Sequence, residues 1–235
     1  MLSPLDCKIY LSRSKHERRQ TMKTLIINAQ PDFRNEAHYS IKLQKQFLSK
    51  FQNQFPDETV DLLNLYDTEI PQLTMDQLLG IWEKQSQHIT LNDEEKRIFA
   101  INQHLIQQFK EHHRIVIVSP LHNFNVTSKL KDYIDNILVA HETFKYTAEG
   151  SVGLMTDNYK VMLLQASGSI YTNNDRYTPL EFSRMYLQGI FEELMGFDKF
   201  SIVRIQGLQT QGVDVDKAVA QGKKDLDVEF NKFYE

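Results

Sequence analysis

The sequence is short of the features that mark secreted, membrane and nucleic-acid-binding proteins. It contains one cysteine, Cys7, in 235 residues, which excludes an internal disulfide. No apolar run approaches the roughly 20 residues of a membrane-spanning helix. The formal net charge is only −4, so nothing favours nucleic acid or an anionic membrane as the main partner. We therefore expect a cytoplasmic protein with no nucleic-acid and no membrane partner.

Signatures of several large enzyme classes are absent as well. The sequence has no G-x-G-x-x-G fingerprint, no Walker A loop and no G-x-S-x-G elbow, so chemistries that depend on these motifs find little support. His112 and His113 are adjacent at a predicted helix end, and their side chains therefore point apart. His141-Glu142 lacks the second histidine of a zinc-protease motif. We expect no metal site.

The remaining composition is that of one globular domain. Hydrophobic residues make up 41% and charged residues 25% of the chain, a balance typical of folded proteins. Residues 1–21 are an exception, because basic side chains dominate there and the apolar stretch is too short for a secretory signal. We expect residues 1–21 to be a disordered extension and residues 22–235 to form a single domain. A start at Met22 and a mitochondrial-type presequence are the alternatives for the extension.

Strand and helix patterns alternate from Met22 onward. Five short apolar runs are typical of strands buried in a parallel sheet; they cover residues 24–27, 60–65, 115–118, 161–164 and 202–205. Helical segments lie between and after them, including one capped by Asn92 and Glu95 and others over residues 179–195 and 214–233. Right-handed crossovers then predict an α/β fold, a doubly wound five-stranded parallel sheet in the order 2-1-3-4-5 with helices on both faces.

Such sheets bind ligands at the carboxyl ends of their strands, where the strand order reverses. This rule selects the loops that follow Asn28, Val118 and Leu164. The first loop leads into a helix start, whose free N–H groups and dipole attract a phosphate, with Arg34 as an additional positive charge. Taken alone, this segment also fits an ordinary connection between a strand and a helix.

The other two loops suit a planar ring. Residues 120–127 place apolar and flat side chains beside two amides, which an isoalloxazine ring requires for its faces and its pyrimidine edge. Residues 166–170 are small, so their backbone N–H groups can approach the ring edge where charge develops on reduction. A structural histidine at position 122 and a plain tight turn at 166–170 are the alternatives.

Three sequence blocks resemble one family, the FMN-dependent NADH-azoreductases among the flavodoxin-like quinone and azo reductases. The blocks are Pro120–Val126 with Lys129–Lys131, then Thr143–Gly150 and, less closely, Gln165–Tyr171. Ala29–Pro31 is similar to the family's first loop. The resemblance implies a flavodoxin-like fold and an FMN-containing homodimer with active sites between its subunits. NADH or NADPH would reduce small aromatic quinone or azo acceptors with ping-pong kinetics, by hydride transfer through flavin N5.

The resemblance also implies roles for individual residues. The flavin ring would contact Pro120, Leu121, His122, Asn123 and Phe124, and its pyrimidine side Ala166, Ser167, Gly168 and Ser169. The phosphate would lie among Gln30, Arg34, His38 and Ser40. The substrate pocket would include Phe144 and Tyr146, and the polar candidates for a catalytic role are Tyr146, Tyr171 and His122. Residues 66–91 match a family excursion near the interface.

The first loop departs from the family pattern. Residues 36–39 stand where the family usually carries serines, and Ser40 is displaced. A carboxylate such as that of Glu36 is unfavourable beside a phosphate unless it points away. We hypothesise that Arg34, His38 and backbone N–H groups compensate.

Two further functions stay open. One is another reaction on the same scaffold, as in an FAD-containing quinone reductase or a flavodoxin-like electron carrier. The second is a non-catalytic sensor or binding protein, which the altered first loop keeps in consideration. Two-electron turnover with NADH and a quinone, set against one-electron shuttling, would distinguish the reactions on this scaffold. A yellow purified protein would argue against a sensor that has lost flavin affinity.

Overall fold

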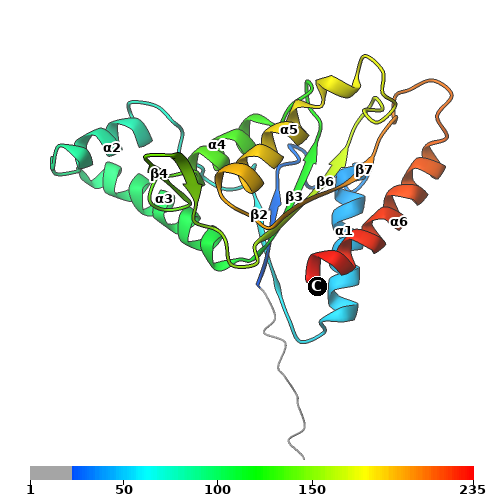
Figure 1. Ribbon diagram of the computed structural model, residues 1–235, viewed down its shortest axis with the longest axis horizontal. Coiled ribbons are helices and arrows are strands. Elements are labelled where there is room, and N and C mark those ends of the chain that lie inside the picture. The colour runs from blue at the N-terminus through cyan, green and yellow to red at the C-terminus, as the bar shows by residue number, and fades with distance from the viewer. Residues whose placement is uncertain (1–22) are drawn as a thin grey trace, which may run out of the picture.

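A five-stranded parallel sheet forms the centre of the fold (Figure 1). The computed structural model describes residues 23–235, so the predicted N-terminal extension and Cys7 lie outside the described residues. The strand order is β2-β1-β3-β6-β7, with bounds β1 Thr24–Asn28, β2 Val60–Asn64, β3 Arg114–Pro120, β6 Lys160–Ala166 and β7 Lys199–Ile205. This confirms the predicted order of the five strands.

Side chains alternate between the two faces of the sheet, as the strand period requires. Ile26, Val116 and Met162 belong to one buried cluster, which is covered by α1 (Tyr39–Gln54) and α6 (Val215–Tyr234). Leu25 and Ile115 belong to the other cluster. The elements over that second face are α3 (Asp93–Glu111), α4 (Ser128–Ile137), α5 (Phe182–Gln188) and the π-helix η2 (Gly189–Leu194). Figure 1 shows the two helical layers on opposite sides of the sheet.

The predicted capping pair at the start of α3 is present. The Glu95 N–H donates to Oδ1 of Asn92, and the Asn92 N–H donates to Oε2 of Glu95, both at 2.9 Å. These two bonds satisfy N–H groups that no helical carbonyl can reach. The short helix α2 (Leu78–Ser86) packs on α3, and together they extend away from the sheet as a lobe (Figure 1).

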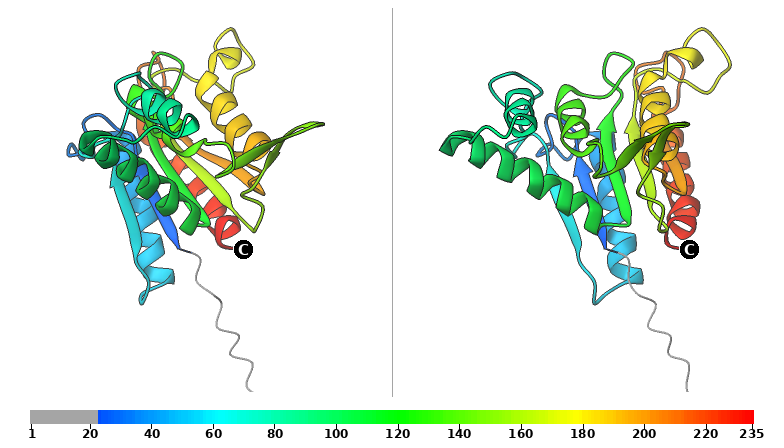
Figure 2. Two further views of the ribbon diagram at one scale, coloured as in Figure 1. Left: turned by 90° about the vertical axis from the view of Figure 1, so that its left-hand side faces the viewer. Right: turned by 60° about the vertical axis from the view of Figure 1, so that its left-hand side comes forward.

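Two features differ from the predicted pattern. Residues 144–147 and 150–153 form a separate antiparallel hairpin, β4 (Phe144–Thr147) and β5 (Gly150–Gly153), which extends away from the main sheet (Figure 2). The helix predicted over 179–195 is divided into a 3₁₀ turn η1 (Thr178–Leu180), α5 and η2. Pro179 lies in the 3₁₀ turn, and a π-turn widens the later part.

The register brings the three predicted loops together. Asn28 is paired with Val118 at the ends of β1 and β3, and Pro120 is paired with Ala166 at the ends of β3 and β6. The loops that follow these strands therefore share one edge of the sheet. Within residues 23–235, no helix is both long enough and apolar enough to cross a bilayer.

Candidate functional site

Backbone hydrogen bonds extend the strand ladder into the loops. The Ala29 N–H donates to the Val118 carbonyl at 2.8 Å, and the Leu121 N–H donates to the Ala166 carbonyl at 2.9 Å. The Thr127 hydroxyl donates to the Ala29 carbonyl at 3.2 Å, and it does not cap the start of α4. The first, second and third loops are therefore fixed to one another before any ligand binds.

The first loop brings Gln30 and Ser40 together at the start of α1. The Gln30 Nε2 atom donates to the Ser40 hydroxyl oxygen at 3.2 Å, and both residues are buried. His38 occupies the N-cap position, but its side chain caps no N–H group, and the first turn contains no acid. The first backbone N–H groups of a helix have no intrahelical acceptor. This end of α1 can therefore receive an anion.

Arg34 and His38, the two basic residues predicted to assist phosphate binding, each have a carboxylate partner. The Arg34 guanidinium lies 3.2 Å from Oδ1 of Asp67. The His38 Nε2 atom lies 3.1 Å from Oδ2 of Asp32. A hydrogen bond from the Asn35 side chain, followed by the one from His38, lowers the pKa of Asp32. His38 is therefore held in the loop, whereas Arg34 is turned toward the segment after β2.

Glu36 points away from the helix start. Its carboxylate forms an ion pair with the Lys45 ammonium on α1, and its side chain is 72% exposed. Lys45 lies beyond the first turn of the helix, so the pair draws the carboxylate along the outer surface. This orientation meets the condition for tolerating an acid near a phosphate.

The second loop contains a strained two-residue turn. His122 and Asn125 exchange backbone hydrogen bonds at 3.1 and 2.9 Å. The residues between them both have left-handed backbones, with φ of 46° at Asn123 and 66° at Phe124. Such a conformation costs about 1–2 kcal/mol for each residue other than glycine. The turn presents the Phe124 ring, and Phe124 is 37% exposed. Strain of this kind is concentrated at functional sites.

The third loop is fixed by the segment that follows β7. The Gly207, Leu208 and Gln209 N–H groups donate to the carbonyls of residues 169, 167 and 168. The N–H groups of Gly168 and Ser169 donate to no acceptor within the described part of the chain. They therefore remain available at the edge next to the strained turn.

Two tyrosines extend the surface around Phe124. The Tyr171 and Phe124 rings meet edge to face, with centroids 6.4 Å apart, and the Tyr177 ring meets Tyr171 at 6.3 Å. Burial, and then the charge of Glu181, raises the pKa of Tyr171. Its hydroxyl therefore stays protonated near neutral pH and serves as a hydrogen-bond donor rather than a base.

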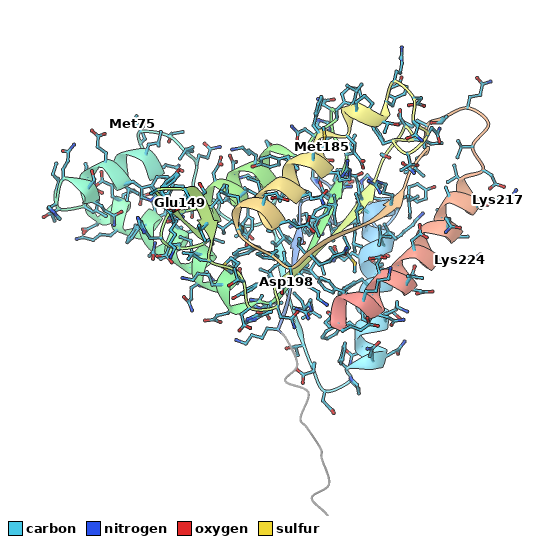
Figure 3. The ribbon with its side chains drawn as sticks, in the orientation of Figure 1. Met75, Glu149, Met185, Asp198, Lys217 and Lys224 are labelled. Atoms are coloured by element: carbon cyan, nitrogen blue, oxygen red, sulfur yellow. The ribbon has the colours of Figure 1, made fainter. Side chains whose placement is uncertain are left out.

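The two residues predicted for the substrate pocket lie elsewhere in this chain. Phe144 is buried and Tyr146 is 70% exposed, both on the hairpin, with ring centroids 5.3 Å apart. The hairpin packs against the end of η2, where a Cβ on Gly153 would lie 2.3 Å from the Met195 backbone. Figure 3 labels Glu149, in the turn that joins the two strands. The structure thus joins the three loops but not the hairpin.

Sequence reasoning missed a buried polar group behind the second loop. Glu181 accepts two hydrogen bonds from Arg204, and Ser183 donates its N–H to the Phe124 carbonyl. No motif or spacing marked these residues, because they come from separate segments that meet only in the fold. Among residues 23–235, no group of three or more histidine, cysteine or acidic residues is arranged to hold a metal ion.

The donor set fits a planar ring with a phosphate group. The helix start that His38 leaves uncapped lies beside the buried Gln30–Ser40 pair. The N–H groups of Gly168 and Ser169, which have no acceptor among residues 23–235, accompany an exposed aromatic ring at Phe124. The first feature suits an anion, and the free N–H groups and the aromatic ring suit the edge and face of a heteroaromatic ring.

Known proteins share the fold and much of the sequence of this chain. The model of the family described as having a flavodoxin-like fold matches residues 22–229. The FMN-dependent NADH:quinone oxidoreductase 1 of Lactiplantibacillus plantarum is 70% identical over 213 residues, which cover 91% of this chain and 99% of that protein. The corresponding enzyme of Streptococcus agalactiae is 45% identical over the same shares. The crystal structure of an FMN-dependent NADH-azoreductase from Bacillus anthracis in complex with FMN has a TM-score of 0.86 and 41% identity, covering 91% of this chain and 100% of that chain.

Proposed function

The chain belongs to the FMN-dependent NADH:quinone oxidoreductases and azoreductases of flavodoxin-like fold, and from this premise we propose that the three loops hold the FMN through which NADH reduces quinone and azo compounds. The observation that carries the placement is the strained turn at residues 122–125. It lies beside the N–H groups of Gly168 and Ser169, which are unpaired within the part of the chain that the structure describes. When bound, FMN supplies the two-electron hydride chemistry.

Each loop has a distinct task in this proposal. Leu121–Phe124 support the ring, with the turn backbone fixed by its own hydrogen bonds. The N–H groups of Gly168 and Ser169 face the pyrimidine edge and favour the reduced state, because fixed dipoles stabilise the charge that develops there. Gln30, His38 and Ser40 surround the phosphate at the start of α1. Arg34 contributes only a more distant charge, since Asp67 holds it.

The donor and the acceptor use one apolar face in turn. The exposed Phe124 ring and the half-buried Leu121 border this face. Tyr171 is buried and keeps its proton, so it orients ligands by donating a hydrogen bond. His122 is exposed to solvent. No dedicated acid is needed, because water can protonate the reduced acceptor.

We also propose that the protein works as a homodimer. Five large apolar side chains have more than a third of their surface exposed: Tyr146 and Val152 on the hairpin, Leu154 directly after it, and Phe182 and Met185 on α5. Figure 3 shows Met185 on α5 and Met75 near the α2 lobe. A second copy that covered the hairpin would bring Tyr146 toward the partner's loops and complete the substrate pocket. Sedimentation analysis of the wild type and of Tyr146→Asp tests this, and a monomeric wild type would refute it.

The decisive experiment combines a spectrum with kinetics. The purified chain is expected to be yellow, to release FMN rather than FAD on denaturation, and to oxidise NADH with a quinone or an azo dye as acceptor. Parallel double-reciprocal lines are expected from a shared face, and intersecting lines would contradict it. A colourless chain that stays so with excess FMN would favour a non-catalytic sensor or binding protein. Release of FAD would favour an FAD-containing quinone reductase, and one-electron shuttling alone would favour a flavodoxin-like electron carrier.

The location proposed for the protein is the cytoplasm. The single cysteine, Cys7, offers no internal disulfide, which suits a reducing compartment. Fractionation of the source cells tests this proposal.

A further inference from the structure

The strained turn is held from outside by the start of α5. The carbonyl of Phe124, whose φ is 66°, accepts a hydrogen bond from the Ser183 N–H at 3.3 Å. A left-handed backbone at a bulky residue persists only where the surroundings determine it. The internal bonds of the turn join its two outer residues, so the bond from Ser183 is a separate constraint on the carbonyl of Phe124.

Ser183 is itself fixed to the sheet. It is buried, and its hydroxyl oxygen accepts a hydrogen bond from Nε2 of Gln165 at 2.9 Å. Gln165 lies on β6, between Ser119 of β3 and Arg204 of β7 in the register. The position of the Ser183 N–H is therefore set by the strands.

Glu181 provides the second anchor, two residues before Ser183. Its carboxylate accepts Nε–H and Nη2–H of Arg204 at 2.8 and 2.9 Å, and its side chain is only 4% exposed. The Arg184 Nε atom lies 3.4 Å from the same carboxylate. Paired bonds between a guanidinium and a carboxylate fix orientation as well as distance. Because Glu181 is the N-cap residue of α5, this pair fixes the first turn of the helix.

We infer that Glu181 is a positioning residue for flavin binding: by pairing with Arg204 it holds the start of α5 so that Ser183 keeps the turn at Phe124 in its strained form. This inference rests on the proposed function of that turn in supporting the flavin ring. Glu181 acts through Ser183 and Phe124, and it contacts no ligand itself.

The neighbouring Tyr171 supports the same role. The charge of Glu181 contributes to the raised pKa of Tyr171, after burial. The Tyr171 ring in turn packs edge to face against Phe124. Two neighbours of Glu181 therefore contact the turn: Ser183 bonds to its backbone, and Tyr171 packs on its exposed ring.

The test measures FMN affinity of the full chain after removal of its flavin. Glu181→Gln keeps the shape of the side chain but loses the charge and one of the two acceptors for Arg204. We expect the FMN Kd, measured by quenching of flavin fluorescence, to rise about tenfold. The visible circular dichroism of the bound flavin should change as well. The control is Asp227→Asn, which weakens an ion pair with Lys50 between α1 and α6; its Kd should stay within about twofold of the wild type.

A double-mutant cycle with Phe124→Gly separates positioning from a merely structural role. Glycine adopts a left-handed backbone without strain, so the turn would no longer need to be held. Glu181→Gln should then weaken FMN binding by less than about threefold in the Phe124→Gly background.

Each outcome bears on one claim. A wild type that binds no FMN would refute the proposed function rather than this inference. A wild type that binds FMN, with Glu181→Gln binding equally well or with additive effects in the cycle, would overturn the inference. If Glu181→Gln does not fold, Arg204→Lys takes its place, because it retains the charge and loses the paired geometry. Arg204→Lys must then weaken FMN binding to the same extent and show the same coupling with Phe124→Gly.

Discussion

The two edges of the central sheet are built in opposite ways. At the amino ends of the strands, polar groups are buried and directed at oxygen atoms. Arg114 is 1% exposed and donates to backbone and side-chain oxygens of Asn158. Both ring nitrogens of His112 lie near oxygens, of Gln108 at 2.6 Å and of Asp61 at 2.9 Å. This edge is arranged for stability.

The carboxyl edge keeps donors free and backbone strained. Asn123 and Phe124 have left-handed backbones, and the N–H groups of Gly168 and Ser169 have no acceptor among the described residues. The unpaired and strained groups of the carboxyl edge thus lie where a ligand can compensate for them. Changes at the amino edge should therefore alter stability alone, and changes at the carboxyl edge should alter binding.

The largest effect is expected at the amino edge. Arg114→Ala removes a donor to the oxygens of Asn158 and packing on Phe233. The free energy of unfolding should fall by about 3 kcal/mol. Urea unfolding measures this, and FMN titration of the folded variant should give a Kd within about twofold of the wild type. A large loss of FMN affinity would break the contrast between the edges.

The next largest effect is expected at the carboxyl edge, where FMN affinity should change and stability should not. Phe124→Gly relieves the left-handed backbone but removes the ring, so FMN affinity should fall about tenfold. Stability of the flavin-free protein should stay within about 1 kcal/mol, because relief of strain offsets the entropy cost of glycine. Titration with FMN and urea unfolding measure the two quantities. A strongly destabilised variant with normal FMN affinity would reverse the assignment.

A smaller change at the carboxyl edge concerns the altered phosphate loop. Glu36→Ser removes a negative charge that Lys45 partly neutralises, so FMN should bind about threefold more tightly. Higher salt should reduce the gain. The matched control is Asp57→Ser, which removes an exposed charge from the loop before β2 and should leave the Kd unchanged. Equal affinity of Glu36→Ser and wild type would mean that Glu36 does not act on the phosphate.

The smallest effect is a pH dependence at the amino edge. Burial, opposed in part by the charge of Asp157, lowers the pKa of His113, which stacks on Tyr159 with centroids 4.2 Å apart. A histidine whose pKa is lowered in the folded state stabilises the fold above its unfolded pKa of about 6.5 and loses that contribution as the pH falls further. His113→Phe keeps a stacked ring and should lose less stability on acidification. Urea unfolding of both proteins across this pH range measures the two losses of stability. Equal losses in the wild type and in His113→Phe would show that His113 does not cause the pH dependence.

The fold could largely be predicted because its central strands have a recognisable apolar sequence pattern. Runs such as residues 115–118 are apolar on both faces, as buried parallel strands must be. The hairpin β4–β5 was not predicted as strands, since its four-residue strands are mostly exposed and lack a regular alternation. Its position depends on the close approach of Gly153 to Met195, which only the tertiary structure reveals.

The parts of the site that depend on strand order could be predicted from the sequence. The parts that depend on ion pairs between residues far apart in the chain could not. The three loops followed from strand order alone, whereas Glu181 and Arg204 are 23 positions apart in the chain. A charged residue just before the exposed Phe182 suggests a solvated surface, so no pattern indicated a buried pair. The ion-pair partners of Arg34 and Glu36 depend in the same way on side-chain directions that spacing does not encode.

The main-chain links between the loops have a consequence for the evolution of this scaffold. Bonds such as Ala29 N–H to Val118 and Leu121 N–H to Ala166 involve no side chain, so mutation can exchange loop residues while the frame keeps its shape. New electron acceptors could thus be acquired by varying a few exposed side chains, which makes these loops suitable positions for saturation libraries in directed evolution.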